Sequence, residues 1–94
     1  MRIGILKLHI HLDGCSSLKE KRSQIKPLLE RLHRQFNVST AEIDFQDLHQ
    51  EALLAVSVIN NNSAWIQSYL SGVIDWVEKY FPNAEIQDQQ TEII

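Results

Sequence analysis

Two histidines stand two positions apart near the start of the chain, His9 and His11, in a segment that alternates between apolar and polar residues. In a β-strand this spacing places both imidazoles on one face, roughly 7 Å apart. Such a pair can ligate a metal when a third donor joins it, and the candidates are His49, Asp44 and Asp47. Because ligand number defines a metal site, one pair is weak evidence. A metal-dependent hydrolase is therefore the weakest function considered, and no metal is predicted.

Positive charge is the second feature with chemical meaning. Six of the nine Lys and Arg fall between residues 19 and 34, whereas residues 37–94 carry a single lysine among many carboxylates. A cationic helix can follow a phosphate backbone, which supplies most nucleic-acid affinity. The alternative is a solvated helix whose long side chains cover the edges of the core. The predicted contacts with an anionic partner are Lys19, Lys21, Arg22, Lys26, Arg31 and Arg34.

The basic residues do not share one face of the predicted helix. At 100° per residue, Lys19, Arg22, Lys26 and His33 fall within one narrow sector. Arg31 and Arg34 lie on the outer face of the helix. Lys21 points close to the apolar sector, so we expect it to pair with an acidic residue of the sheet. The predicted binding surface is therefore one basic edge of the helix.

Other catalytic chemistry has little support in this chain. Cys15 is the one cysteine, so no internal disulfide can form, and we interpret it as a turn residue. Phosphate-binding G-x-x-x-x-G-K, H-E-x-x-H and paired C-x-x-C motifs are missing. Residues 1–4 alternate like a strand, and no apolar run is long enough to span a membrane. We expect a non-enzymatic cytoplasmic protein without a cofactor, a membrane segment or an evident small-molecule substrate.

Hydrophobic periodicity predicts six elements that must position these side chains. They are a strand at 2–12, a helix at 18–35, strands at 38–45 and 52–59, a helix at 64–81 and a strand at 84–94. Ser17 with Glu20 forms a capping box at the first helix, and Pro27 predicts a kink in it. The order β-α-β-β-α-β predicts one α+β domain over residues 1–94. It is the ferredoxin-like arrangement, a four-stranded antiparallel sheet with both helices on one face.

An aromatic flank accompanies the apolar stripe of the second helix, formed by Trp65, Tyr69, Trp76 and Tyr80. Packing against the first helix and the sheet is the favoured interpretation, because a small domain needs large side chains to bury enough area. The alternative is a protein-binding patch.

Several blocks of the sequence resemble the YlxP-like family of small bacterial proteins. They are the stretch 17–22 (SLKEKR), the stretch 36–39 (FNVS) followed by Ala41 and Glu42, and then Asp47, Leu48 and Gln50. The loop 13–16 lacks the proline often found there, and His49 replaces a common aromatic. The resemblance implies a domain of unknown function. Genes of the family often lie among those for translation initiation and ribosome maturation, which implies a ribosome- or RNA-related role without established catalytic residues.

These observations favour a protein that binds RNA, the ribosome or a translation or ribosome-maturation partner through the basic edge of its first helix. The alternative is a homodimeric interaction module, in which the open sheet face with Ile3, Ile5 and the histidines pairs with a second copy. Two known uses of the fold are disfavoured. The third strand has no aromatic on which an RNA base could stack, and the loop after the first strand has no arginine for a phosphate cradle.

Overall fold

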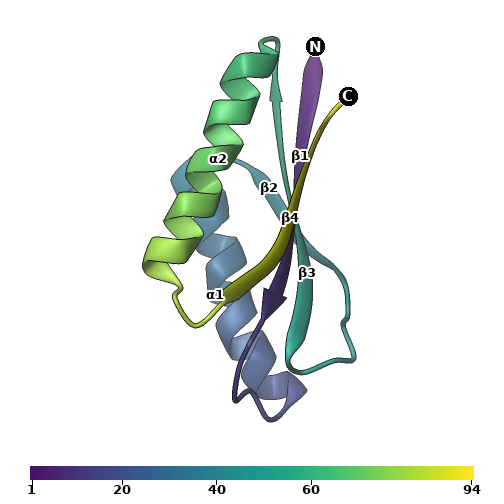
Figure 1. Ribbon diagram of the computed structural model, residues 1–94, viewed down its shortest axis with the longest axis vertical. Coiled ribbons are helices and arrows are strands. Elements are labelled where there is room, and N and C mark those ends of the chain that lie inside the picture. The colour runs from purple at the N-terminus through teal and green to yellow at the C-terminus, as the bar shows by residue number, and fades with distance from the viewer.

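The computed structural model describes residues 1–94 and confirms the predicted fold class. Its elements are β1 (Arg2–His11), α1 (Leu18–Phe36), β2 (Ser39–Asp44), β3 (Glu51–Asn60), α2 (Ser63–Tyr80) and β4 (Glu85–Ile93). Four strands form one antiparallel sheet in the order β2-β3-β1-β4 (Figure 1). The predicted boundaries hold to within one residue at every end.

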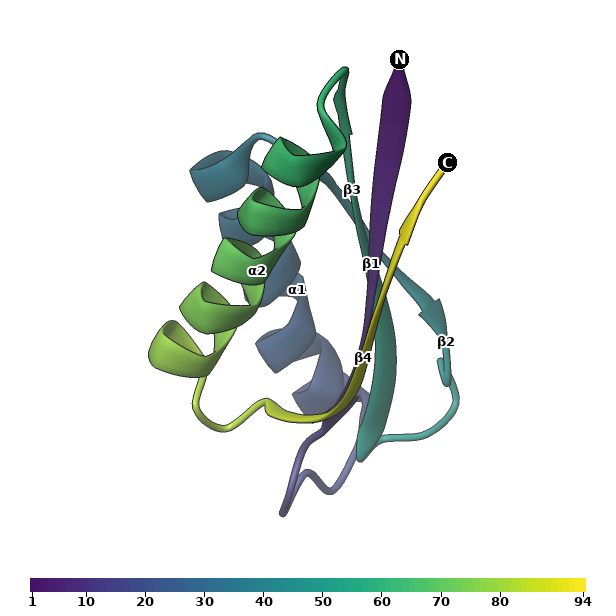
Figure 2. The ribbon, with the colours of Figure 1, turned by 45° about the horizontal axis from the view of Figure 1, so that its top comes forward.

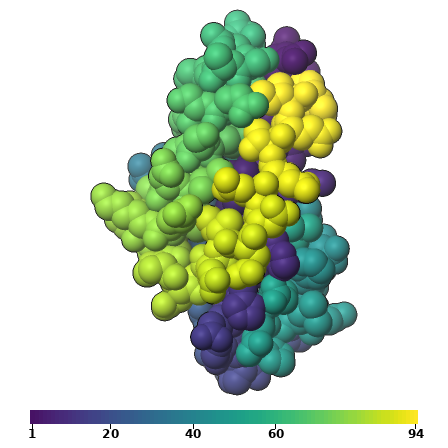
Figure 3. Space-filling model, viewed as in Figure 1, coloured from purple at the N-terminus to yellow at the C-terminus, as the bar shows by residue number.

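Both helices cover the same face of the sheet, and the other face carries no element (Figure 2). β2 and β4 are the two edge strands, and β4 lies along the surface beside α2 (Figure 3). The β2–β3 pairing is regular from Ser39 to Glu42 and then shifts register before Asp44. A bulge of this kind ends the regular edge of a strand.

The core lies between the sheet and the helices, because apolar residues alternate along the central strands. Leu6, Leu8 and Ile10 of β1 are fully buried, as are the residues of β3 that pair with them. Ile25, Leu28 and Leu32 of α1 and the equivalent stripe of α2 pack on this layer. Gly4 permits the close approach of α2, since a Cβ at that position would overlap the Ile66 side chain. Cys15, expected in an ordinary turn, is buried within the core.

Local signals explain where the helices begin and end. The Ser17 hydroxyl accepts from the Glu20 N–H at 3.1 Å, and the Glu20 carboxylate reaches back to Ser16, so a cap forms as predicted. Asn37 ends α1 in the left-handed conformation at φ 52°. The Asn62 side chain caps α2 by accepting from the Trp65 N–H. α1 continues through Pro27 as one helix. Neither helix is both long and apolar enough to cross a membrane.

Aromatic side chains line the junction of the two helices, and we call this group the aromatic seam. Trp76 and Tyr69 are half-buried and pack against the core, as the favoured interpretation expected. Trp65 and Tyr80 are 41% and 48% exposed and lie at the surface. The full group is Phe36, Trp65, Tyr69, Trp76, Tyr80 and Phe81.

Candidate functional site

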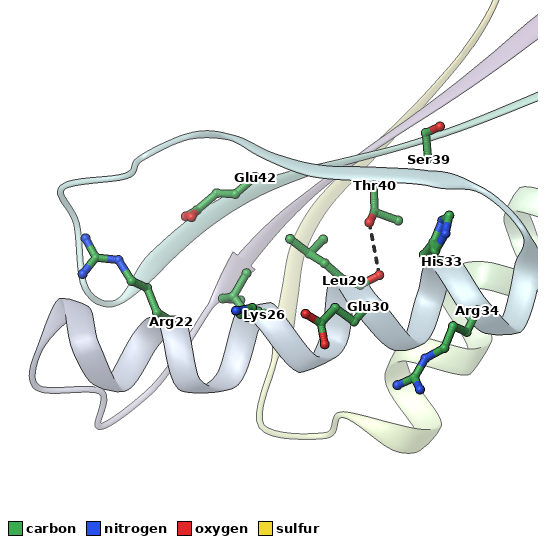
Figure 4. Close-up of a pocket in the computed structure, with 10 residues that line it drawn as sticks. Arg22, Lys26, Leu29, Glu30, His33, Arg34, Ser39, Thr40 and Glu42 are labelled. Atoms are coloured by element: carbon green, nitrogen blue, oxygen red, sulfur yellow. Dashed lines mark hydrogen bonds between the residues drawn. The ribbon is translucent and has the colours of Figure 1, made fainter.

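A groove of about 830 Å³ runs between α1 and the edge strand β2 (Figure 4). One wall is α1, and the other is β2. The lining residues are Arg22, Ile25, Lys26, Leu29, Glu30, His33 and Arg34 from α1, with Ser39, Thr40 and Glu42 from β2. Three of these side chains are permanent cations. We call this feature the α1–β2 groove.

The helical repeat explains why three polar side chains of the groove share one side of α1. Arg22, Lys26 and His33 recur at spacings of four and seven residues, which keeps them on one side of α1. Two hydrogen bonds hold β2 opposite to them. The Thr40 hydroxyl donates to the Leu29 carbonyl at 3.1 Å, and His33 Nδ1 lies 2.7 Å from the Val38 carbonyl oxygen. The groove is therefore fixed by contacts between its own walls.

The β2 wall presents unpaired backbone groups to the groove. The Leu12 N–H donates to the Gln50 carbonyl, which shows that this opposed pair of residues is a hydrogen-bonded pair of the β1–β3 ladder. Because hydrogen bonding alternates along a strand, the even-numbered residues of β3 direct their N–H and C=O groups toward β1. The odd-numbered residues of β3 direct theirs toward β2. Ser39 and Ala41 pair with odd-numbered β3 residues. Thr40 and Glu42 alternate with these two residues along β2. Their N–H and C=O groups therefore point to the other side of the strand, away from the sheet. The ladder therefore leaves these groups without a partner, and none of the backbone hydrogen bonds outside the helices and strands reaches them.

Lys21 does not belong to the accessible basic surface, which corrects its place among the predicted contacts. Its side chain is 1% exposed, and its ammonium donates to the carbonyl oxygens of Phe45, Leu48 and Glu51 at 2.7–2.8 Å. Glu42 Oε2 lies 2.7 Å from the same nitrogen. An ammonium has three protons, and the carbonyls take all three, so Glu42 contributes charge without receiving a hydrogen bond. The expected pairing with an acidic residue of the sheet is confirmed.

Arg31 also lies apart from the groove. Its guanidinium stacks against the aromatic seam, 5.2 Å from the Trp76 ring centroid and 5.1 Å from that of Phe81. Such cation–π contacts hold the charge on the α2 side of the helix. Lys19 is exposed near the start of α1 but does not line the groove. Of the six predicted contacts, the structure gathers Arg22, Lys26 and Arg34 in one groove.

Two carboxylates moderate the charge of the α1–β2 groove. Glu42 is compensated by the buried Lys21 ammonium, which leaves Glu30 as the free acidic group. Glu30 falls between Lys26 and Arg34 along the helix, so the three cations divide into two groups. Glu20, in the first turn of α1, does not line the groove. Hydrogen bonds from the Ser16 N–H and hydroxyl lower its pKa and engage its carboxylate in the cap.

A second polar cluster occupies the open sheet face. The sequence predicted its two histidines but not the carboxylate that joins them. His9 and His11 share that face as predicted, but their partner is Glu51 rather than His49, Asp44 or Asp47. Glu51 Oε2 lies 2.6 Å from His9 Nε2, and Oε1 lies 2.9 Å from His11 Nδ1. The antiparallel register places Glu51 directly opposite His11, a pairing visible in the sequence only once the register is known.

Hydrogen bonding dominates the electrostatics of this cluster. The bond to Glu51 raises the pKa of His11, and the bond from His11 lowers the pKa of Glu51. Each carboxylate oxygen faces a different histidine, and no group of three or more His, Cys, Asp or Glu converges as a metal site would require. The arrangement fits a structural bridge between β1 and β3.

The loop after β2 connects the two sites. Phe45 adopts the left-handed conformation at φ 65°, which is strained for a bulky residue. Its ring packs against His9 on the open face, with centroids 5.3 Å apart, while its carbonyl accepts from Lys21 on the helix side. These contacts on both sides of the sheet compensate for the strained backbone.

Comparison with known proteins gives the same fold and one sequence family. The family described as "Protein of unknown function (DUF503)" matches residues 3–91. The uncharacterized protein YlxP of Bacillus subtilis (strain 168) is 30% identical over 90 residues, which cover 96% of this chain and 97% of the relative.

Solved structures resemble the chain in fold alone. The structural genomics protein YJCS has a TM-score of 0.58 at 11% identity, with 96% of each chain covered. The de novo designed ferredoxin-fold protein LFR1 has a TM-score of 0.56 at 10% identity over 98% of this chain and 85% of the design. SnoaB, a cofactor-independent oxygenase from Streptomyces nogalater, has a TM-score of 0.52 at 8% identity, with 99% of this chain and 90% of SnoaB covered.

Proposed function

Because the chain belongs to the DUF503 family of proteins of unknown function, we propose its role from the site: a non-enzymatic, cytoplasmic protein that binds RNA, including RNA of the ribosome. The observation that carries this proposal is the α1–β2 groove, where Arg22, Lys26 and Arg34 are accessible on a chain with a net charge of −3. Phosphate contacts made by such residues supply sequence-independent affinity.

Charge asymmetry orients the partner. Outside α1 only Arg2, Lys7 and Lys79 are basic, whereas carboxylates are spread over the remaining strands and α2. An approaching polyanion is repelled by this part of the surface and attracted to the α1 side. The groove is therefore the place where a phosphate backbone meets favourable charge.

Co-sedimentation with ribosomes tests the proposal. We expect the variant Arg22→Glu/Lys26→Glu/Arg34→Glu to lose co-sedimentation while its melting temperature stays close to that of the wild type, because all three side chains are exposed. The matched control is Arg2→Glu/Lys7→Glu/Lys79→Glu, which reverses the same number of charges elsewhere and should still sediment. For three phosphates on a single strand, the slope of log affinity against log salt should be about −2. Unaltered sedimentation of the α1 variant would overturn the proposal.

The open sheet face supports a second candidate, a homodimer. Neither helix covers this face, and Ile59 there is 63% exposed, beside half-buried Ile3, Ile5 and Leu53. Pairing with a second copy would bury this apolar strip, provided that about 800 Å² per partner is covered. Light scattering after size-exclusion chromatography should show a dimer that Ile5→Glu dissociates and Leu48→Glu, in the exposed loop, does not. A wild type that stays monomeric at millimolar concentration would exclude this candidate.

A further inference from the structure

We propose that the α1–β2 groove takes single-stranded RNA, with phosphates on the α1 wall and base edges on the free backbone of β2. This inference rests on the proposed function and names the form of RNA that the same site would select. It follows from the two unlike walls of the groove, one cationic and one carrying unpaired backbone donors and acceptors.

The α1 wall offers two positions for phosphates. Arg22 and Lys26 lie about 6 Å apart along the helix axis, from a rise of 1.5 Å per residue, and Arg34 lies beyond Glu30 with His33. The Glu30 carboxylate repels a phosphate placed between these groups. A backbone that follows the wall therefore meets Arg22 and Lys26 toward one end of the groove and Arg34 toward the other, where Figure 4 shows the Arg34 side chain directed away from β2.

The β2 wall offers the hydrogen bonds that bases need. Thr40 and Glu42 each direct one N–H and one C=O away from the sheet, by the alternation of the ladder. Unstacked bases expose donors and acceptors on their edges, whereas a duplex consumes them in pairing. Ile25 and Leu29 supply an apolar floor between the walls. A single strand can use both walls, and a duplex can use only the cations.

An extended peptide is the competing occupant, because peptides add to free sheet edges as an extra strand. Here the usable edge is short. The register of β2 shifts after Glu42, and Phe45 turns into the left-handed region, so only two residues present outward pairing groups. That is less than the span of an ordinary strand. The same two residues suffice for one or two bases.

Fluorescence anisotropy with a labelled 12-nucleotide RNA of unstructured sequence tests the inference. We expect the single strand to bind about tenfold more tightly than the same RNA annealed to its complement, since two hydrogen bonds of the usual net strength give that ratio. Equal or tighter binding of the duplex overturns the inference but leaves the proposed function standing. Binding of neither form overturns both.

Two variants at one position isolate the backbone of β2. Thr40→Pro removes the outward N–H, and Thr40→Val retains it; both lose the hydroxyl bond to Leu29. Proline is tolerated where a strand N–H faces away from the sheet. We expect Thr40→Pro to bind the single strand about two- to tenfold more weakly than Thr40→Val, with duplex binding unchanged. Equal affinities of the two variants would refute the base contact.

Amide NMR of the wild-type chain gives an answer that does not depend on folding of the proline variant. Addition of the single-stranded 12-mer should shift the Thr40 and Glu42 amide resonances, and addition of the duplex should leave them in place. Shifts confined to residues of α1 would contradict the role of β2. Displacement of the RNA by an acidic 12-residue peptide, with the same β2 shifts, would assign the groove to a peptide instead.

Discussion

Replacing Lys21 by methionine is the sharpest test of how this fold holds the loop between β2 and β3. Methionine keeps an unbranched apolar side chain of similar length but removes the ammonium. Three carbonyl oxygens, those of Phe45, Leu48 and Glu51, then lose the ammonium, although that of Phe45 still accepts from the Leu48 N–H. Glu42 loses the cation 2.7 Å away. The side chain is 1% exposed, so its position is closed to bulk solvent in the intact fold.

The expected cost follows from the unequal burial of the partners. Removing one member of a buried ion pair costs about 3–5 kcal/mol, because the remaining charge is left without compensation. Glu42 retains 20% exposure and the loop is mostly exposed, so rearrangement of the loop can restore part of the solvation. We therefore expect a loss of about 3 kcal/mol for Lys21→Met. Glu42→Gln should cost less, because the ammonium keeps all three of its hydrogen bonds.

Urea unfolding followed by tryptophan fluorescence measures these differences, since Trp65 and Trp76 both lie on α2. With an m-value of about 1–1.5 kcal/mol/M, a loss of about 3 kcal/mol lowers the midpoint by roughly 2–3 M. Lys19→Met, an exposed lysine of the same helix, is the matched control and should stay within about 0.5 kcal/mol of the wild type. A Lys21→Met midpoint within the range of that control, or a Glu42→Gln cost equal to that of Lys21→Met, would refute the reasoning.

Three further predictions concern other parts of the structure. Asn62→Ala removes the cap of α2 and should cost about 1 kcal/mol in urea unfolding, with Asn61→Ala as the neutral comparison. Gly4→Ala forces a methyl group against Ile66 Cγ2, so it should destabilise the fold by about 1–3 kcal/mol in urea unfolding, and Ile66→Ala, which removes that atom, should cost less in the Gly4→Ala background than in the wild type. Because the pKa of His11 is raised above its ordinary value of about 6.5, its stabilisation is complete below that pH and is lost as pH rises through the raised pKa. The lowered pKa of Glu51 acts oppositely, and its stabilisation is lost as pH falls below about 4.5 through the lowered pKa. Melting temperatures should therefore be highest between about pH 4.5 and 6.5, and His11→Asn should flatten the alkaline limb; an unchanged pH profile in that variant would contradict the assignment.

The fold could be predicted from the sequence because its local signals agree with one another. The Ser17 and Asn62 caps, the alternation in β1 and the apolar stripe of α1 each indicate the element that forms. The burial of Lys21 could also be predicted, since the helical repeat alone points it toward the sheet. Each of these features is set by the helical or strand repeat and by residues within a few positions along the chain, even where, as at Lys21, the partners come from a distant segment.

The composition of the candidate site could not be predicted to the same extent, because it depends on register and on which strand lies at an edge. Glu51 meets His11 only through the β1–β3 pairing, and Thr40 lines a groove only because β2 is terminal in the sheet. Arg31 looks equivalent to Arg34 on a helical wheel, yet the aromatic side chains of α2 attract one and not the other. Contacts between distant segments decide each of these outcomes.

The connection between β2 and β3 should tolerate changes in length less well than most surface loops do. Lys21 binds the carbonyls of Phe45, Leu48 and Glu51, which are spaced three residues apart, so one inserted or deleted residue would move at least one of them out of reach. The Asn60–Asn62 turn has no such internal anchor beyond its own side chains. An epitope tag, a split site or new chain ends from circular permutation should therefore be placed in that turn. In related chains, we expect natural length variation to concentrate there and to be missing between Phe45 and Glu51.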